Sequence, residues 1–119
     1  MDRKKIEILK YRGQGSTAFT GRPEGKLARI DLCLDEKDSD GIYYVVVIPK
    51  NTTSFNSSFF LGLFFDSIKK MGTIDKFYDK YSFEIEETDA EWRTILGRNL
   101  AECRRKATNE LNHSTGIDF

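Results

Sequence analysis

The sequence predicts an α/β fold, in which helices pack on a small sheet that is mixed or mainly parallel. Segments with the pattern of strands alternate along the chain with segments that have the pattern of helices. The candidate strands lie near 5–11, 42–48 and 81–86, and the candidate helices lie near 23–35, 57–71 and 88–107. Strands that are joined through helices favour parallel pairing with right-handed crossovers. We therefore expect a single α/β domain.

The composition agrees with one folded domain. The chain has 119 residues, of which 39% are hydrophobic and 32% are charged, and this profile is globular. Its 19 basic and 19 acidic side chains cancel, so the charge gives no sign of the basic surface that a nucleic-acid binder needs. Apolar runs fall far short of the roughly 20 residues of a membrane span, and the first residues lack the apolar region of a signal peptide. We expect a cytoplasmic protein without a membrane segment.

The first half of the chain supplies a strand and a helix. Alternating apolar and polar residues indicate a strand with one covered face. The glycine-containing loop that follows lacks the spacing of a dinucleotide-binding fingerprint or a P-loop, so we interpret it as a turn. In the helix, Leu27, Ile30 and Leu34 are predicted to form the buried face. Lys26 and Arg29 are predicted to face outward.

An apolar strand near 42–48 leads through a hydroxyl-rich loop into an apolar helix. The strand is rich in β-branched residues and does not alternate, as expected at the centre of a sheet flanked by helices. The loop lies at the carboxyl end of this strand, where open α/β sheets place their ligand sites. Asn56 is predicted to cap the helix and Gly72 to end it.

The helix near 57–71 is apolar on nearly all sides. The expected buried face comprises Phe60, Leu63, Phe64 and Ile68. Phe59, Leu61 and Phe65 lie off that face. Such a helix is either surrounded by the core or partly an interface, and the sequence leaves both interpretations open.

The last predicted helix begins with a capping box formed by Thr88 and Glu91. Its apolar stripe comprises Trp92, Ile95, Leu96, Leu100, Cys103 and Ala107. Its basic residues lie mostly outside that stripe: Arg93, Arg98, Arg104, Arg105 and Lys106. Residues 1–107 are expected to form the domain, and 108–119 a flexible tail. Because three strands make a thin sheet, we expect an additional strand from 14–20 or from the tail.

Candidate catalytic and metal-binding residues are sparse. Cys33 and Cys103 are isolated within apolar helical patterns, and we expect both to be reduced core residues. The single histidine, His113, lies in the polar tail, which argues against a Ser-His-acid or Cys-His hydrolase. No cluster has the spacing of metal ligands, so we expect neither a metal nor a cofactor. Five carboxylates form no recognised pair: Asp66, Asp75, Asp79, Glu84 and Glu86.

The segment from Asn51 to Phe65 carries a family resemblance. A strand followed by Asn56-Ser57-Ser58 and an apolar helix resembles the phosphorylation-site turn of STAS domains, whose usual form in anti-sigma-factor antagonists is Asp-Ser-Ser-Gly. The longer run Ser-Phe-Asn-Ser-Ser-Phe-Phe-Leu-Gly-Leu-Phe more closely resembles STAS-like proteins of unknown function from bacteria and their phages. The likeness follows the element order over roughly residues 20 to 105, but its specific part is 52–64. Asn56 replaces the acid and Phe59 the glycine.

This resemblance implies a STAS-like domain that acts as a non-enzymatic regulator. Its partner would be a protein, an ATPase-like anti-sigma kinase, with Ser57 aligned to the phosphorylated serine and Ser58 as the neighbouring candidate. The implied partner-binding residues are Thr53, Ser54, Asn56, Ser57, Ser58, Phe59 and Leu61. Two alternatives stay open: a nucleic-acid-associated or phage or defence accessory factor that uses the basic last helix, and a small enzyme with an unrecognised site. The sequence also leaves open whether the protein is a monomer or a homodimer.

Overall fold

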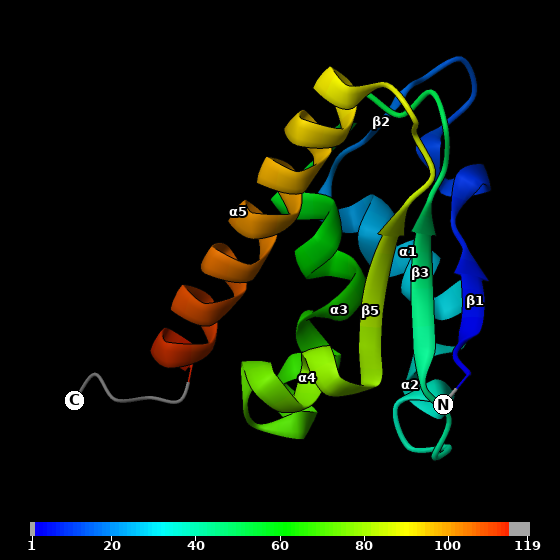
Figure 1. Ribbon diagram of the computed structural model, residues 1–119. Coiled ribbons are helices and arrows are strands. Elements are labelled where there is room, and N and C mark those ends of the chain that lie inside the picture. Colours follow the sequence, from blue (N-terminus) through cyan, green and yellow to red (C-terminus); the bar gives the residue numbers. More distant parts are fainter. Residues whose placement is uncertain (1, 115–119) are drawn as a thin grey trace.

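The computed structural model describes residues 2–114 and has the expected α/β fold (Figure 1). Its strands are β1 (Lys4–Glu7), β2 (Ala18–Phe19), β3 (Tyr44–Ile48), β4 (Ser54–Phe55) and β5 (Tyr81–Ile85). Its α-helices are α1 (Arg22–Asp31), α2 (Leu34–Lys37), α3 (Ser57–Met71), α4 (Ile74–Lys80) and α5 (Ala90–Ser114), and a 3-10 helix, η1, spans Leu9–Arg12. No helix within this part of the chain has both the length and the apolar composition that crossing a bilayer requires.

The main sheet has three parallel strands in the order β1-β3-β5. β3 is central, as predicted, with Val46 paired to Ile6 on one side and to Phe83 on the other. Each step moves the chain one strand further in the same direction, so right-handed crossovers place α1 and α3 on one face of the sheet. Figure 1 shows these two helices behind the strands. On the other face, exposed Lys5 and Glu84 lie 3.9 Å apart.

Two expectations about the strands are corrected. The first strand ends at Glu7 rather than near residue 11, because the chain turns after Ile8, whose carbonyl accepts from the Tyr11 amide at 3.0 Å. Residues 14–20 do contain a strand, β2, but it pairs in parallel with β4 in a separate two-stranded sheet. Within residues 2–114 the main sheet therefore stays three-stranded. The other expected source of a strand, at residues 115–119, lies outside the described part.

α3 is the centre of the hydrophobic core. It packs between α1 and α5, and it also contacts α4. The predicted buried face is fully buried, and Phe59 is buried with it. Phe65 and Leu61 retain exposed fractions of only 7% and 9%. The interpretation of α3 as a helix surrounded by the core is therefore confirmed.

The α1–α3 contact is a close approach of two helix backbones. A Cβ atom added to Gly25 would lie 2.2 Å from the Phe59 carbonyl oxygen, and one added to Gly62 would lie 2.1 Å from the Arg22 carbonyl oxygen. Only glycine leaves room for this contact. The small residues of α1 therefore face α3.

The predicted buried face of α1 is wrong. Leu27 and Ile30 are 68% and 73% exposed, whereas Arg29 is 6% exposed. Of the three residues of the expected face, only Leu34 is buried. Leu34 belongs to α2 rather than α1, because the chain turns at Cys33, which has a φ of 55°. Cys33 itself is exposed rather than a core residue. Hydrophobic periodicity does not predict the buried face of α1, because the contact between α1 and α3 is made through glycines. Arg29 can be buried at this contact because it has polar partners there.

The last helix differs from its prediction at both ends. Asp89, not Thr88, caps it: the Asp89 carboxylate accepts from the Trp92 amide at 3.1 Å. Trp92 is 38% exposed, so it is not a core residue. Leu96, Cys103 and Ala107 are fully buried, and both cysteines are free thiols. α5 continues to Ser114, so residues 108–114, including His113, are helical rather than a tail; the remaining expected tail residues lie outside the described part.

Candidate functional site

The predicted site lies at the carboxyl end of the main sheet, where β2 and β4 hold the hydroxyl-rich loop. The Thr53 amide donates to the Thr17 carbonyl at 2.8 Å, and the Asn56 amide donates to the Phe19 carbonyl at 2.9 Å. The Phe55 amide donates to the side chain of Asn99 on α5 at 2.8 Å. Two segments distant in sequence, that around β2 and α5, therefore fix the backbone that leads into α3.

Asn56 caps α3, as predicted. Its backbone is extended, and its side-chain oxygen accepts from the Ser58 amide at 2.8 Å and from the Ser58 hydroxyl at 2.7 Å. These bonds satisfy one of the free amides that every helix start presents. Gly72 ends the helix with a φ of 86°, which is also as predicted.

The two candidate serines differ in their contacts. The Ser58 hydroxyl donates to Asn56 and accepts from the amide of Gly21, the N-cap of α1, at 3.1 Å. Ser57 is the first residue of α3 and is partly exposed, and no residue within 2–114 forms a hydrogen bond with its hydroxyl. The hydroxyl of Ser58 therefore holds the local structure, while that of Ser57 has no hydrogen-bond partner in the described part of the chain.

The other residues of the predicted partner surface separate into two groups. Thr53 and Ser54 are partly exposed, and the Thr53 hydroxyl lies 2.8 Å from that of Thr17. Phe59 is fully buried against Phe19, and Leu61 is nearly buried. The surface at this site is therefore formed by the loop and the first turn of α3, without the apolar residues that follow.

A shallow cavity of about 340 Å³ lies beside the loop, and sequence reasoning missed two of the residues that line it, Glu87 and Trp92. The Glu87 carboxylate accepts from the backbone amides of Asp89, Asn51 and Thr88, and these bonds lower its pKa. The remaining lining residues are Thr17, Asn51, Thr52 and Thr53. Glu87 thus joins the segment before α5 to the hydroxyl-rich loop.

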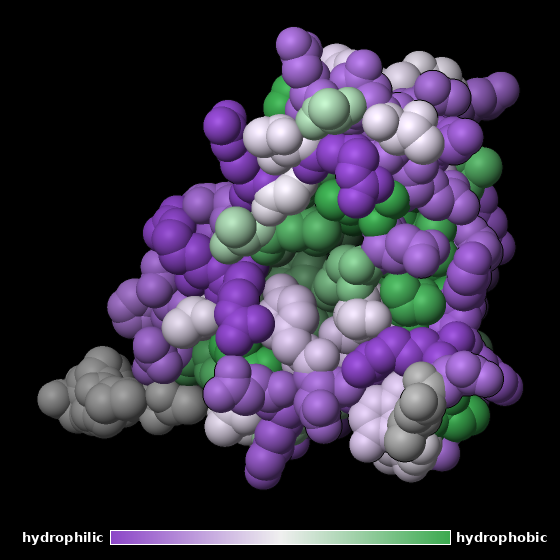
Figure 2. Space-filling view, in the orientation of Figure 1, coloured by the Kyte–Doolittle hydropathy of each residue, from purple (hydrophilic) through white to green (hydrophobic). Residues whose placement is uncertain are grey.

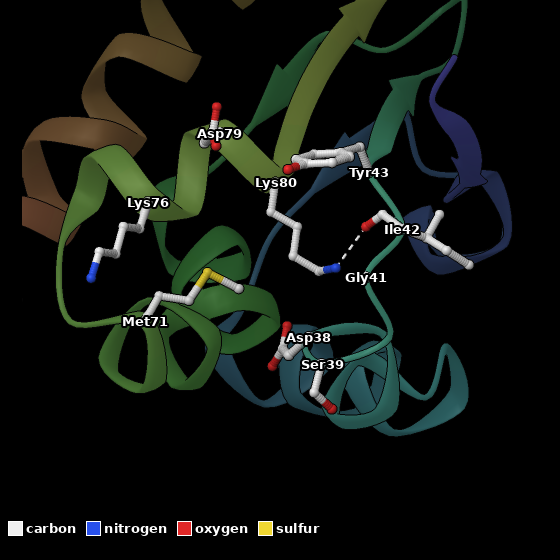
Figure 3. A pocket seen from close by; sticks show the side chains of 9 residues that line it. All are labelled: Asp38, Ser39, Gly41, Ile42, Tyr43, Met71, Lys76, Asp79 and Lys80. Atoms are coloured by element: carbon white, nitrogen blue, oxygen red, sulfur yellow. Dashed lines mark hydrogen bonds between the residues drawn. The ribbon is translucent and has the colours of Figure 1, made fainter. Parts of the chain in front are cut away.

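A second cavity, of about 320 Å³, lies at the opposite end of the sheet (Figure 3). Its Lys80 ammonium donates to the Ile42 carbonyl at 2.6 Å and pairs with Asp40 at 3.1 Å. Burial acts to raise the pKa of Asp40, but hydrogen bonds from Tyr44, the Ile42 amide and Lys80 outweigh it and lower that pKa to about 2. The charges of Lys80 and Asp40 are therefore used within the chain.

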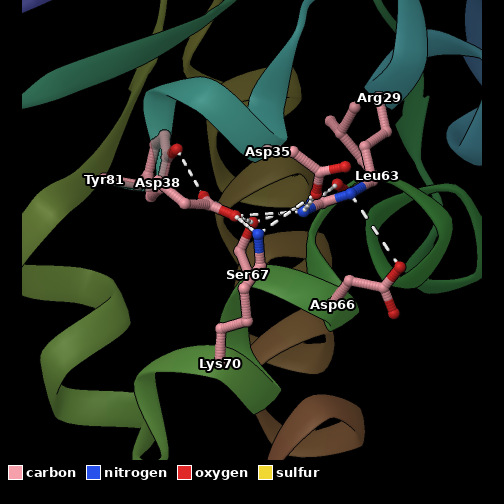
Figure 4. A network of polar contacts seen from close by, with 8 residues as sticks. All are labelled: Arg29, Asp35, Asp38, Leu63, Asp66, Ser67, Lys70 and Tyr81. Carbon is pink, nitrogen blue, oxygen red and sulfur yellow. Dashed lines mark hydrogen bonds and ion pairs between the residues drawn. The ribbon is translucent and has the colours of Figure 1, made fainter. Parts of the chain in front are cut away.

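A buried polar network joins α1, α2, α3 and β5 (Figure 4). The Arg29 guanidinium donates to the Leu63 carbonyl at 2.9 Å, to the Ser67 hydroxyl at 2.7 Å and to the carboxylates of Asp35 and Asp38.

The Asp38 carboxylate also accepts from the Tyr81 hydroxyl and lies 3.0 Å from the Lys70 ammonium. Burial, followed by the bond to Asp38, raises the pKa of Tyr81. Every buried side-chain nitrogen and oxygen within 2–114 has a hydrogen-bond partner. The network therefore joins elements, and its donors and acceptors are already used.

The charged groups offer limited chemistry. Within residues 2–114, no three His, Cys, Asp or Glu side chains are placed to hold a metal ion. The basic residues of α5 are mostly engaged: Arg104 contacts Asp75, Arg105 contacts Glu102, and Arg93 donates to the carbonyls of Ile85 and Glu87.

No family model, curated protein or solved structure matches the chain. The resemblance to STAS-like proteins therefore rests on the sequence motif.

Proposed function

We propose that this protein is a non-enzymatic, STAS-like regulatory module that binds a protein partner at the start of α3. Phosphorylation of Ser57 switches this binding, and the resemblance assigns the phosphorylation to an ATPase-like kinase partner. The observation that carries the proposal is the contrast between two neighbouring serines: the Ser57 hydroxyl, partly exposed at a helix start, has no hydrogen-bond partner within 2–114, while the Ser58 hydroxyl is bound to Asn56 and Gly21.

The surroundings of Ser57 favour a negative charge. A phosphoserine adds a charge of about −1.5 to −2 near neutral pH. Ser57 lies in the first turn of α3, where free amides and the helix dipole stabilise anions. The Gly21–Ser58 hydrogen bond also brings the start of α1 next to that of α3. The fold therefore tolerates the phosphate, while a partner that covers Ser57 loses affinity through desolvation and repulsion.

The proposal is tested by mass spectrometry of the protein purified from its source cell, followed by pull-down with wild-type and variant chains. We expect phosphate on Ser57, and we expect Ser57→Asp to fold like the wild type but to recover less partner. The dipole should stabilise the new carboxylate by about 0.3–1 kcal/mol. Ser58→Ala is the control for the cap: it should lower the free energy of unfolding by about 1 kcal/mol without supplying a charge.

Arg98→Glu is the control for charge, because Arg98 is an exposed residue of α5, outside the first turn of α3. Arg93 is unsuitable, since its guanidinium holds two backbone carbonyls. Phosphate found only on Ser58, or Ser57→Asp binding as strongly as the wild type, would contradict the proposal.

A further inference from the structure

A hollow opens between α5 and the edge of the main sheet. Figure 2 shows it near the middle of the molecule, with hydrophobic residues at its floor and hydrophilic residues around it, in the region that Figure 1 shows between α5 and β5. Four hydrophobic residues of the three surrounding elements are only partly buried: Tyr78 of α4, Phe83 and Ile85 of β5, and Leu100 of α5. The hollow is therefore an apolar surface next to a sheet edge.

β5 is the edge strand on this side, and its outer backbone groups are open. The Glu86 amide donates to the Ile48 carbonyl of β3, so even-numbered residues of β5 direct their backbone groups toward β3. The odd-numbered residues direct theirs outward. Two of these outward groups have a partner within 2–114: the Ile85 carbonyl accepts from the Arg93 guanidinium at 2.9 Å, and the Tyr81 amide donates to the Phe77 carbonyl. The Phe83 amide and carbonyl and the Ile85 amide remain available to another strand.

α5 faces this edge with a glycine. Arg93, Gly97, Leu100 and Arg104 follow one another at helical spacing, and Arg93 and Arg104 reach β5 and α4 respectively. No described atom lies within 4 Å of the position that a Cβ on Gly97 would take. Glycine destabilises a helix interior, and here, unlike at Gly25 and Gly62, no internal contact requires it. Its small size keeps the space opposite β5 open.

The rim of the hollow is basic. The Arg93 guanidinium donates to two carbonyls, and within 2–114 no carboxylate pairs with it. Arg104 lies over the ring of Tyr78 and contacts Asp75 at 3.2 Å. A ligand with an acidic group near Arg93 is therefore complementary to this rim, whereas Arg104 already has a carboxylate beside it.

We propose that the hollow receives an extended segment of a partner protein, which adds to β5 as a fourth strand of the main sheet. Its backbone pairs with the open groups of Phe83 and Ile85. Its apolar side chains lie at alternate positions on Tyr78 and Leu100, and an acidic side chain meets Arg93. This mode of recognition takes affinity from backbone hydrogen bonds and specificity from alternate side chains. The surface is separate from Ser57 and does not depend on the function proposed above.

A second copy of the chain is a poorer occupant. Two copies docked hollow to hollow would bring Arg93 of one copy, which no carboxylate within 2–114 pairs with, toward Arg93 of the other, and like charges repel at an interface. An acidic strand from another protein avoids this repulsion. Its backbone supplies hydrogen-bond partners for the open groups of β5.

The test is a selection of octapeptides from a random displayed library on the wild-type protein, with counter-selection on Gly97→Trp. Enriched peptides should alternate apolar and acidic residues. A synthetic peptide of the enriched sequence should slow hydrogen exchange of the Phe83 and Ile85 amides. Its Kd should rise by at least about tenfold for Gly97→Trp, which fills the hollow, because occlusion of a central contact removes most of the binding energy. N-methylation of alternate peptide amides should weaken binding by a similar factor.

Arg98→Trp is the matched control, since it places the same side chain on the exposed side of the same helix. It should change the Kd by less than about twofold, as expected for a residue outside the interface. Four outcomes would overturn the proposal: no enrichment above background, equal binding to Gly97→Trp, unchanged exchange at Phe83 and Ile85, or enriched peptides that bind as helices. Protection of these amides by self-association without peptide would also overturn it, because the occupant would then be a second copy.

Discussion

Arg29 is buried at the contact between α1 and α3, where α3 and the segment of α2 with its C-cap supply acceptors for its guanidinium. A buried charge is tolerated only when it is paired and hydrogen-bonded. Here the acceptors include Asp38, whose side chain is only 4% exposed. Burial acts to lower the pKa of Arg29, but hydrogen bonds to Asp35 and Asp38 outweigh it and raise that pKa. The Arg29 guanidinium therefore stays charged inside the fold.

We predict that Arg29→Met lowers the free energy of unfolding by about 3 kcal/mol, because loss of one partner leaves the other as an uncompensated buried charge. The remaining contact of Asp38 with Lys70 keeps the loss at the lower end of that range. Lys26→Met, on the exposed side of the same helix, should stay within about 0.5 kcal/mol. Urea unfolding followed by circular dichroism measures both. Equal losses in the two variants would show that the network does not stabilise the fold.

At the scale of elements, three helical glycines have opposite roles. Gly25 and Gly62 let the backbones of α1 and α3 touch, whereas Gly97 of α5 touches nothing in the described chain. The same substitution should therefore have opposite effects at the two kinds of position. This contrast separates a packing requirement from the ordinary preference of a helix for alanine.

We predict that Gly25→Ala and Gly62→Ala each destabilise the protein by about 1–3 kcal/mol, since the added methyl group overpacks the α1–α3 contact. Gly97→Ala should instead stabilise it by about 0.5–1 kcal/mol, because alanine is the better residue in a helix interior. Thermal and urea unfolding of the three variants provide the measurement. If Gly25→Ala is as stable as the wild type, α1 and α3 are further apart than the structure places them.

Across the whole molecule, acidic groups at separate places have lowered pKa values. Hydrogen bonds from Tyr11 and Lys10 lower the pKa of Asp31, and those from Arg29 and Lys70 lower the pKa of Asp35. A carboxyl group whose pKa is lower in the folded state stabilises the fold above its unfolded pKa, and the contribution disappears as the pH falls through the folded pKa. Burial and then the bond to Asp40 act in the opposite direction on Tyr44, raising its pKa to about 12.

We predict that stability is nearly constant between about pH 5 and pH 7, and that it falls as the pH drops below about 4, the ordinary pKa of aspartate. The loss should continue to pH 2, which is about the pKa of Asp40 in the fold. At alkaline pH the contribution of Tyr44 is present below its unfolded pKa of about 10 and is lost as the pH rises further. Urea midpoints across this range give the profile. A fall in stability that begins between pH 7 and pH 5 would assign the pH dependence to other groups.

Much of the element order could be predicted from the sequence, because local patterns determine it. The run of β-branched residues marks β3 as the central strand, and Asn56 and Gly72 mark the ends of α3 through the hydrogen bonds that helix termini need. For the candidate site, the serines and their cap could be found in the same way. Which serine hydroxyl stays open could not be predicted, because it depends on Gly21, which is 37 residues away from Ser58.

Only the tertiary structure decided which side of α1 is buried. The apolar pattern of α1 selects Leu27 and Ile30, but its small residues and Arg29 face α3, because backbone contact through two glycines excludes larger side chains there. The exposure of Trp92 and the open edge of β5 could not be predicted for the same reason, since both depend on the position of α5 relative to the sheet. Hydrophobicity and capping act within a few residues and are visible in the sequence. The distance between two packed elements depends on the side chains of both surfaces, which are far apart in the sequence. It is therefore determined only in the folded structure.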